Sequence, residues 1–162
     1  MDKEARLDGA PVAEHPQALR LWLRLLTCTQ LVERQIRGGL RTAFDTTLPR
    51  FDLMAQLERA RDGLKMNELS RRMMVTGGNV TGITDQLVTE DLVERVNVDG
   101  DRRAYRVRLT PKGRKVFADM ALAHEAWVVD AFSDLSEREL DSLHRLLGKV
   151  KQRAQAAPKE KT

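Results

Sequence analysis

The sequence predicts a mainly α-helical protein that carries one small β-hairpin. Apolar residues recur at intervals of three and four along most of the chain, which is typical of helices with one buried face. From Tyr105 to Leu109, apolar and charged residues alternate instead, as they do in a half-buried strand. Asp99-Gly100 precedes this stretch, and this pair is favoured in two-residue hairpin turns.

The first part of the chain predicts an arm and two helices. Residues 1–16 combine proline, glycine and charges, and we expect a flexible arm there. A helical pattern extends from residue 17 to about residue 44 and is weakened near its end by Gly38-Gly39. Leu48-Pro49 then marks a break. A further helix is expected from Phe51 to Ala60, because Phe51, Met54 and Leu57 form an apolar stripe.

The centre of the sequence predicts two short helices, around residues 69–73 and about 78–88. The second has one apolar stripe, formed by Val80, Ile83 and Leu87. Its opposite face consists of Gly78, Thr81, Gly82 and Asp85, with Asn79 and Gln86 on the flanks. Such a small, hydrogen-bonding face can enter a DNA major groove, where Asn, Gln and Thr side chains meet base edges. A glycine inside the helix costs about 1 kcal/mol relative to alanine, so its presence needs a reason.

A hairpin follows the second helix. Its first strand is expected from Leu92 to Val98, and its return strand ends at Leu109. Arg102 and Arg103 stand at its tip, from which they can reach a minor groove or the phosphates. Together these elements predict a DNA-binding winged helix-turn-helix over residues 49–110. The alternative is an ordinary surface helix and hairpin with solvated charges.

Two further helices are predicted after the hairpin. Thr110-Pro111 opens the first, with proline in the first turn, and apolar residues continue at helical spacing to Ala131. Ser136–Glu139 forms a capping box before the second, and Leu135 with Leu140 forms a hydrophobic staple. Within that last helix an apolar seam is formed by Leu140, Leu143, Leu147 and Val150.

Long helices on both sides of the DNA-reading unit predict a homodimer. Residues 17–48 and 111–155 would form its helical dimerisation region, and residues 156–162 a disordered tail. A two-fold dimer would place two reading units on half-sites about one helical turn apart. Packing within one subunit gives the same apolar pattern and is the alternative.

The excess positive charge lies in the proposed reading unit. Residues 50–115 contain 14 Lys and Arg against 10 Asp and Glu, whereas the rest of the chain has 14 of each. The whole net charge of +4 therefore falls on the proposed reading unit, where Lys and Arg side chains could neutralise DNA phosphates and release their counterions. Chance clustering of surface charge is the alternative.

Composition excludes several classes of protein. A chain of 162 residues with 41% hydrophobic content predicts one domain with a core. No stretch approaches 18 consecutive apolar residues, so no transmembrane span is expected. Residues 1–14 lack the apolar region of a secretory signal. One cysteine excludes an internal disulfide and fits a reducing cytoplasm, where we expect this protein to act.

The sequence contains no recognisable catalytic constellation. Gly77–Gly82 lacks the Gly-Lys-Ser/Thr end of a phosphate-binding loop, and no predicted strand precedes it. His15, His124 and His144 lack the spacing of metal ligands. No Ser or Cys stands in a nucleophile motif. We therefore expect neither enzymatic activity nor a bound cofactor or metal.

Several motifs resemble those of the MarR (multiple antibiotic resistance regulator) family. They are Gly78-Asn79-Val80-Thr81, Leu87, Leu92-Val93-Glu94-Arg95, Asp101-Arg102-Arg103 and Leu109-Thr110-Pro111-Lys112-Gly113. The resemblance covers Leu19 to about Arg153. It implies a homodimeric winged-helix transcription regulator, usually a repressor, that binds a palindromic operator and is released by a small ligand, often aromatic.

The resemblance also assigns DNA contacts by position. On the two short helices and the turn between them, the candidates are Arg71, Arg72, Thr76, Gly78, Asn79, Thr81, Thr84 and Asp85. On the hairpin they are Asp101, Arg102 and Arg103. One of these arginines would enter the minor groove while the aspartate orients the hairpin, and which arginine enters stays open.

A narrower resemblance concerns the ligand. The stretches Phe44–Asp52 and His124–Trp127 are similar to those of family members that control aromatic-acid catabolism. This implies a hydroxycinnamic or hydroxybenzoic acid, or its coenzyme A thioester, as effector. Candidate ligand-binding residues are Trp22, Phe44, Arg50, Phe51, Met54, His124 and Trp127, with Arg50 or His124 meeting the carboxylate. The alternative is that the apolar candidates belong to the core and that His124 is a core or dimer histidine.

Two further alternatives concern regulation through Cys28 and a winged helix that does not bind DNA. Some family members sense peroxides through a cysteine in the first helix, where Cys28 lies. A sensing thiol needs polar partners that stabilise the thiolate; Arg24 is one turn away, and the single tyrosine, Tyr105, lies in the hairpin. We favour a buried, inert Cys28. The other alternative is a winged helix that serves as a protein-interaction module.

Overall fold

A computed structural model describes residues 15–73, 77–98 and 100–157. These residues belong to two compact units that divide between Arg34 and Gln35. The first helix, α1 (Pro16–Phe44), crosses this division. Its portion before Arg34 exposes large apolar side chains, namely Leu19, Leu21, Trp22, Leu23, Leu26 and Leu31. Among the described residues, no helix is long and apolar enough to cross a membrane.

The end of α1 shows why two adjacent glycines do not interrupt it. The helix continues unbroken to Phe44, beyond the point where the sequence predicted a weakening. A Cβ atom added at Gly39 would lie 2.6 Å from the indole ring of Trp127 on α5 (Pro111–Ala131). This distance is too short for any side chain, so glycine allows the two helices to approach closely. The packing offsets the helix-breaking tendency of the glycine.

α2 (Leu48–Glu58) begins three residues earlier than predicted. Thr47 caps it, because its hydroxyl accepts a hydrogen bond from the Arg50 N–H at 3.4 Å, and Pro49 lies in the first turn. The proline therefore starts the helix and does not mark a break before it. All five large apolar side chains of α2 are buried, namely Leu48, Phe51, Leu53, Met54 and Leu57.

The sheet has three strands, one more than the predicted hairpin. β2 (Val93–Val98) and β3 (Asp101–Leu109) form the hairpin, and β1 (Leu64–Lys65) pairs with the other edge of β3. All pairings are antiparallel. Gly63 precedes β1 with φ of +87°, and a Cβ there would meet the Val107 carbonyl oxygen at 2.7 Å. Glycine is therefore required where the chain turns into the sheet.

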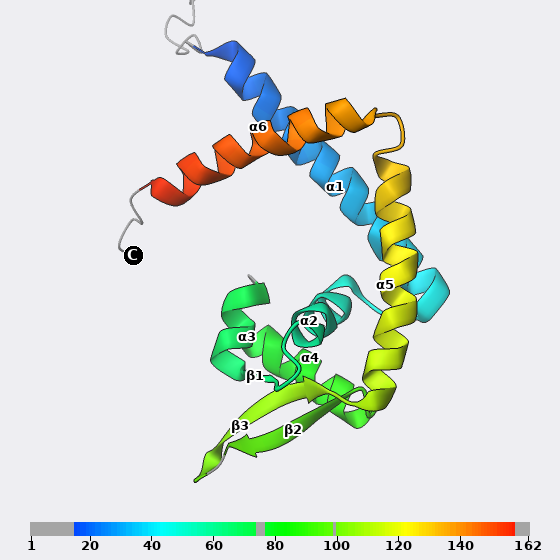
Figure 1. The fold of residues 1–162 in the computed structure, drawn as a ribbon, viewed down its shortest axis with the longest axis vertical. Helices are drawn as coiled ribbons and strands as arrows, with labels where there is room; N and C mark the ends of the chain where they lie inside the picture. Colours follow the sequence, from blue (N-terminus) through cyan, green and yellow to red (C-terminus); the bar gives the residue numbers. More distant parts are fainter. Residues whose placement is uncertain (1–14, 74–76, 99, 158–162) are drawn as a thin grey trace, which may run out of the picture. The chain divides into compact units, whose positions relative to one another are not determined.

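α3 (Met66–Met73) and α4 (Gly77–Thr89) complete the predicted helix pair. Together with α2, they gather beside the base of the hairpin, whose tip projects away from them (Figure 1). The core beneath them is apolar, and its least exposed side chains are Leu53, Met54, Leu57, Leu69, Val80, Leu87, Val93 and Val107. This core fixes α4 on one side and leaves its other side to solvent.

α5 and α6 (Glu137–Ala156) form as the capping signals predicted. Thr110 caps α5, with Pro111 in its first turn. The capping box of α6 is complete: the Ser136 hydroxyl accepts from the Glu139 N–H, and the Glu139 carboxylate accepts from the Ser136 N–H at 2.8 Å. These backbone and hydroxyl hydrogen bonds from Ser136 hold the pKa of Glu139 below its usual range. No residue of α6 is buried.

Candidate nucleic-acid interface

α4 separates its residues into a buried stripe and a small polar face. Val80, Ile83 and Leu87 are buried, as the helical spacing predicted. The opposite side exposes Asn79, Thr81, Gly82, Asp85 and Gln86. A Cβ added at Gly82 would meet no atom of the described residues within 4 Å, so none of their contacts requires glycine there. The exposed face of α4 is therefore free of bulky side chains along one turn.

Thr84 does not belong to this face, which corrects its assignment as a DNA contact. Its side chain is fully buried. The Thr84 hydroxyl donates a hydrogen bond to the Val80 carbonyl oxygen at 2.8 Å and lies 4.0 Å from the Met66 sulfur. Thr84 follows Val80 by four residues and so shares the buried stripe. A threonine can be buried here because its hydroxyl forms a hydrogen bond within the helix.

The basic end of α3 lies near the start of α4 in the chain. Arg71 and Arg72 are exposed in the last turn of α3, and the Arg71 Nε donates to the Asn67 carbonyl oxygen at 3.4 Å. At the other end of α3, the Glu68 carboxylate accepts from the Lys65 N–H at 2.9 Å. This hydrogen bond holds the pKa of Glu68 below its usual range. Thr76, a further candidate, lies outside the described residues.

The tip of the hairpin departs from a regular ladder. Asn97 pairs with Tyr105, but the next residue, Val98, pairs with Asp101. Three extra residues of β3 are therefore accommodated between these pairs, and two of them are Arg102 and Arg103. The side chains of these two arginines lie outside the described part of the structure, whereas Asp101 is exposed. A bulge of this kind re-aims the strand at the tip.

Gly100 makes the turn possible. It adopts φ of +86°, which is the left-handed conformation that the Asp99-Gly100 pair predicted. Asp99 itself lies outside the described residues.

Asp85, on the exposed face of α4, is paired with the hairpin. Its carboxylate forms an ion pair with Arg95 of β2, and the Arg95 guanidinium carbon lies 5.4 Å from the centroid of the Tyr105 ring of β3. Partial desolvation lowers the pKa of Arg95, but the hydrogen bond to Asp85 and the neighbouring Tyr105 raise it by more, so the net shift is upward. A fixed positive charge therefore faces Asp85. No spacing in the sequence predicts this contact.

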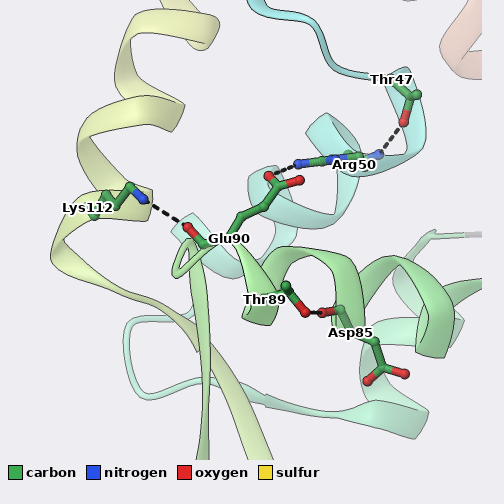
Figure 2. Close-up of polar contacts among 6 residues, drawn as sticks. All are labelled: Thr47, Arg50, Asp85, Thr89, Glu90 and Lys112. Carbon is green, nitrogen blue, oxygen red and sulfur yellow. Dashed lines mark hydrogen bonds and ion pairs between the residues drawn. The ribbon is translucent and has the colours of Figure 1, made fainter.

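A second polar cluster joins the end of α4 to two other helices (Figure 2). The Glu90 carboxylate, just after α4, forms an ion pair with Arg50 of α2. The Lys112 ammonium of α5 donates to the Glu90 carbonyl oxygen at 2.9 Å. Close by, the Thr89 hydroxyl donates to the Asp85 carbonyl oxygen at 3.0 Å. One residue thus ties α2, α4 and α5 together.

The Leu109–Gly113 motif has a structural explanation. The Thr110 hydroxyl donates to the Asp91 carbonyl oxygen at 2.7 Å and accepts from the Gly113 N–H at 2.9 Å. A Cβ at Gly113 would lie only 1.9 Å from the Leu92 carbonyl oxygen. Thr110 and Gly113 therefore fix the start of α5 against the loop that leads from α4 into β2.

The candidate ligand-binding residues are only partly brought together. Phe51 and Met54 are buried, and the Phe51 ring stacks on His124 with centroids 4.7 Å apart and on Phe117 at 5.4 Å. Phe51 and Met54 therefore belong to the apolar core, which is the alternative given for the apolar candidates. Arg50 is engaged with Glu90, although its Nε is buried without a hydrogen-bond partner among the described residues.

The remaining aromatic candidates have different surroundings. Trp127 is half-buried and packs on Gly39, and Phe44 is half-buried at the end of α1. Trp22 is exposed and belongs to the other unit.

The structure contains a hollow that was not predicted from the sequence. It has a volume of about 360 Å³ and lies between the end of α5 and α6. Its lining is formed by Phe132, Leu140, Asp141, Leu143, His144 and Leu147. The predicted seam of α6 supplies three of these side chains, so the seam was the signal for it.

Cys28 is exposed, which corrects the prediction of a buried thiol. Within one chain, the part of α1 that carries Cys28 is exposed almost throughout. Among the described residues, no cluster of three or more His, Cys, Asp or Glu side chains is arranged to hold a metal ion.

Comparisons with known proteins place this arrangement in a family. Residues 44–104 match the MarR family. The regulator YkoM of Bacillus subtilis, named an uncharacterized HTH-type transcriptional regulator, is 30% identical over 118 residues, which are 73% of this chain and 75% of YkoM. Two further curated regulators, YsmB of Bacillus subtilis and PecS of Dickeya dadantii, are matched over 60% and 61% of their own length.

Solved structures agree with the sequence comparison. A MarR family transcriptional regulator from Silicibacter pomeroyi superimposes with a TM-score of 0.74 at 27% identity, covering 88% of this chain and 99% of that one. Sco3205 from Streptomyces coelicolor, a MarR family regulator in complex with DNA, has the same fold, with a TM-score of 0.77 at 22% identity and coverage of 93% and 94%. The chain described here belongs to the MarR family of winged-helix transcriptional regulators.

Proposed function

We propose that this protein is a ligand-responsive repressor that binds a palindromic operator in the cytoplasm as a homodimer. The observation that carries the proposal is the exposed, small face of α4, which stands beside a hairpin whose tip contains two consecutive arginines. We call α4 the recognition helix and the β2–β3 hairpin the wing. Asn79 and Thr81 on the recognition helix have the side chains that meet base edges in a major groove. Sco3205, which shares the fold, is in complex with DNA in its crystal structure.

The two roles assigned to DNA contacts predict different losses. Arg102→Ala and Arg103→Ala should weaken binding to all DNA and reduce its dependence on salt, because each removes a positive charge at the wing tip. Asn79→Ala and Thr81→Ala should change the preferred sequence more than the salt dependence. Arg138→Ala, at an exposed position of α6, removes an equal charge elsewhere and serves as the control. Equal loss of operator and random DNA in the Asn79 and Thr81 variants would contradict base reading.

The homodimer is supported by the apolar surface of the terminal helices. α6 buries no residue within one chain and exposes Leu140, Leu146, Leu147 and Val150, and the first part of α1 exposes a similar set. On each helix, an exposed apolar face of this kind is typical of a subunit interface. Residues 17–48 and 111–155 would form this interface. Such a dimer presents two recognition helices to a palindrome.

For the effector we propose an aromatic acid or its coenzyme A thioester. Arg50 supports this choice, because its buried Nε has no hydrogen-bond partner among the described residues and an anionic ligand would supply one. His124 lies against the same helix through its stack on Phe51. The ligand would release the operator, because the resemblance to the MarR family implies a repressor that a small ligand releases from DNA.

Cys28 supports a second mode of regulation. The thiol is exposed in the structure, as a peroxide-sensing thiol must be. In this alternative, oxidation of Cys28 and not a ligand would release the DNA. Loss of DNA binding on peroxide treatment, prevented by Cys28→Ser, would support it.

The deciding experiment is fluorescence-anisotropy binding to DNA from upstream of the protein's own gene and to scrambled DNA, at two salt concentrations. A panel of hydroxycinnamates, benzoates and their coenzyme A thioesters would be added. Specific, salt-sensitive binding that one panel member abolishes would support the whole proposal. Specific binding that no member disturbs would remove the proposed effector class. Absence of any site, also in genome-wide selection, would favour a protein-interaction module.

A further inference from the structure

The recognition helix carries a single acidic residue, Asp85, and it stands on the face proposed to enter the groove. A carboxylate there would repel phosphates, and in the major groove it can accept hydrogen bonds only from the amino groups of cytosine and adenine. Its side chain is 58% exposed, so burial does not explain its presence. The only described ion pair of Asp85 is with Arg95, on the wing.

Arg95 is held on the side of the wing that faces the helices. It pairs in register with Val107, which is fully buried, so both side chains point to the same face of the sheet. Tyr105 lies two residues before Val107 on β3 and therefore on that face too. Its ring lies beneath the Arg95 guanidinium at 5.4 Å from the ring centroid. The planar Arg95 group is thus bounded by a carboxylate of α4 and by an aromatic ring of β3.

We propose that Asp85, Arg95 and Tyr105 are positioning residues that set the orientation of the wing relative to the recognition helix, and that Asp85 does not read a base. This inference rests on the proposed DNA-binding function. A regulator of this type must place one helix in the major groove and one hairpin tip at the minor groove at the same time. A fixed angle between the two removes motion that binding would otherwise have to freeze. The three residues fix this angle at the exposed end of the core, where apolar packing no longer holds the wing against the recognition helix.

The wing offers a matched control on its other face. Glu94 and Arg108 are directly opposite in the register and form an ion pair at 2.6 Å, with both side chains 42% exposed. This pair joins β2 to β3 and does not involve α4. The variants Glu94→Gln and Arg108→Gln therefore remove a comparable surface pair while leaving the link to the recognition helix intact.

The first test needs no DNA. Tyr105 is the only tyrosine of the chain, so incorporation of 3-fluorotyrosine gives a single ¹⁹F resonance from the wing. Asp85→Asn, on another element, should shift this resonance, and Arg95→Gln should move it in the same direction. Glu94→Gln should move it less than either. An unchanged resonance in Asp85→Asn would overturn the coupling, whatever the DNA results.

The second test is a double-mutant cycle on operator DNA, with hydroxyl-radical footprinting of the minor groove under the wing. Asp85→Asn, Arg95→Gln and the double variant should each lose about fivefold in operator affinity, as expected for one surface ion pair. All three should show weaker wing protection, and the Glu94→Gln and Arg108→Gln controls should not.

Three outcomes would contradict the inference. A changed base preference at one position in Asp85→Asn, with wing protection intact, would make Asp85 a reading residue. A loss confined to Arg95→Gln and reversed in the double variant would mean that Arg95 only neutralises charge. Additive losses in the double variant would mean that the two residues act separately. Absence of operator binding by the wild-type protein would instead remove the proposed function and leave the ¹⁹F result standing.

Discussion

The exposed glycine of the recognition helix gives a sharp test, because stability and DNA binding should change in opposite directions. Gly82 lies inside α4, and a Cβ there would meet nothing within 4 Å in the part of the chain that the structure describes. Gly82→Ala therefore adds a methyl group without strain and reduces the conformational freedom of the unfolded chain. We expect it to stabilise the protein by about 1 kcal/mol. For a chain of this length, this corresponds to a rise in Tm of about 2–4 °C.

The same methyl group should weaken operator binding. It would stand on the face of α4 that carries Asn79 and Thr81 and hold the helix backbone away from the groove floor. Loss of one good base contact corresponds to about 1–3 kcal/mol, or roughly a fivefold to hundredfold loss of affinity. Gly38→Ala in α1, where a Cβ also meets nothing within 4 Å, should give the stabilisation without the loss of binding.

Thermal unfolding and anisotropy titration of the two variants would decide the matter. A stabilised Gly82→Ala protein that binds its operator as tightly as the wild type would refute the close approach of α4 to the groove. A destabilised one would refute the description of Gly82 as an unstrained helical position.

Three other predictions concern stability and the corrected assignment. Gly113→Ala should cost at least about 3 kcal/mol in urea unfolding, because its Cβ would lie 1.9 Å from the Leu92 carbonyl oxygen and only a backbone shift can relieve that contact. Glu139 stabilises the start of α6 as a carboxylate, and its folded pKa is lowered, so this contribution is complete above its ordinary pKa of about 4.3 and is lost as the pH falls through the lower folded value. The free energy of unfolding of Glu139→Gln, compared with wild type across that acid range, should lack this dependence. Thr84→Val should leave the selected operator sequence unchanged and alter the free energy of unfolding by less than about 1.5 kcal/mol. An altered base preference in this variant would show that Thr84 contacts DNA after all.

The elements with strong periodicity or caps could be predicted from the sequence. The stripe of α4, the hairpin turn at Gly100 and the capping box of α6 are all present. Each depends on residues close together in the chain, so local chemistry specifies it. The family resemblance of the motifs was also confirmed.

The missed features depend on residues far apart in the chain. β1 has two residues and therefore no periodicity, and it exists because β3 offers an unpaired edge. Gly39 lies inside a helix that the sequence predicted, but its close contact with Trp127, more than 80 residues later, could not be predicted from local spacing.

The candidate site shows the same division. Asn79 and Thr81 could be placed on an exposed face from helical geometry alone. Thr84 was assigned to the DNA contacts from the resemblance, whereas its position four residues after Val80 places it on the buried stripe. The pairing of Asp85 with Arg95 depends on the angle between a helix and a hairpin, which no sequence spacing expresses.

The ties at Glu90 have a consequence for the construction of chimaeric regulators (Figure 2). Its side chain is held by Arg50 and its carbonyl oxygen by Lys112, so residues 40 positions before it and 22 after it determine where α4 ends. A transplanted recognition helix should therefore be joined before Glu90, leaving the host's own residue at that position. A graft that carried a foreign residue across this junction would need the matching partners from α2 and α5 as well.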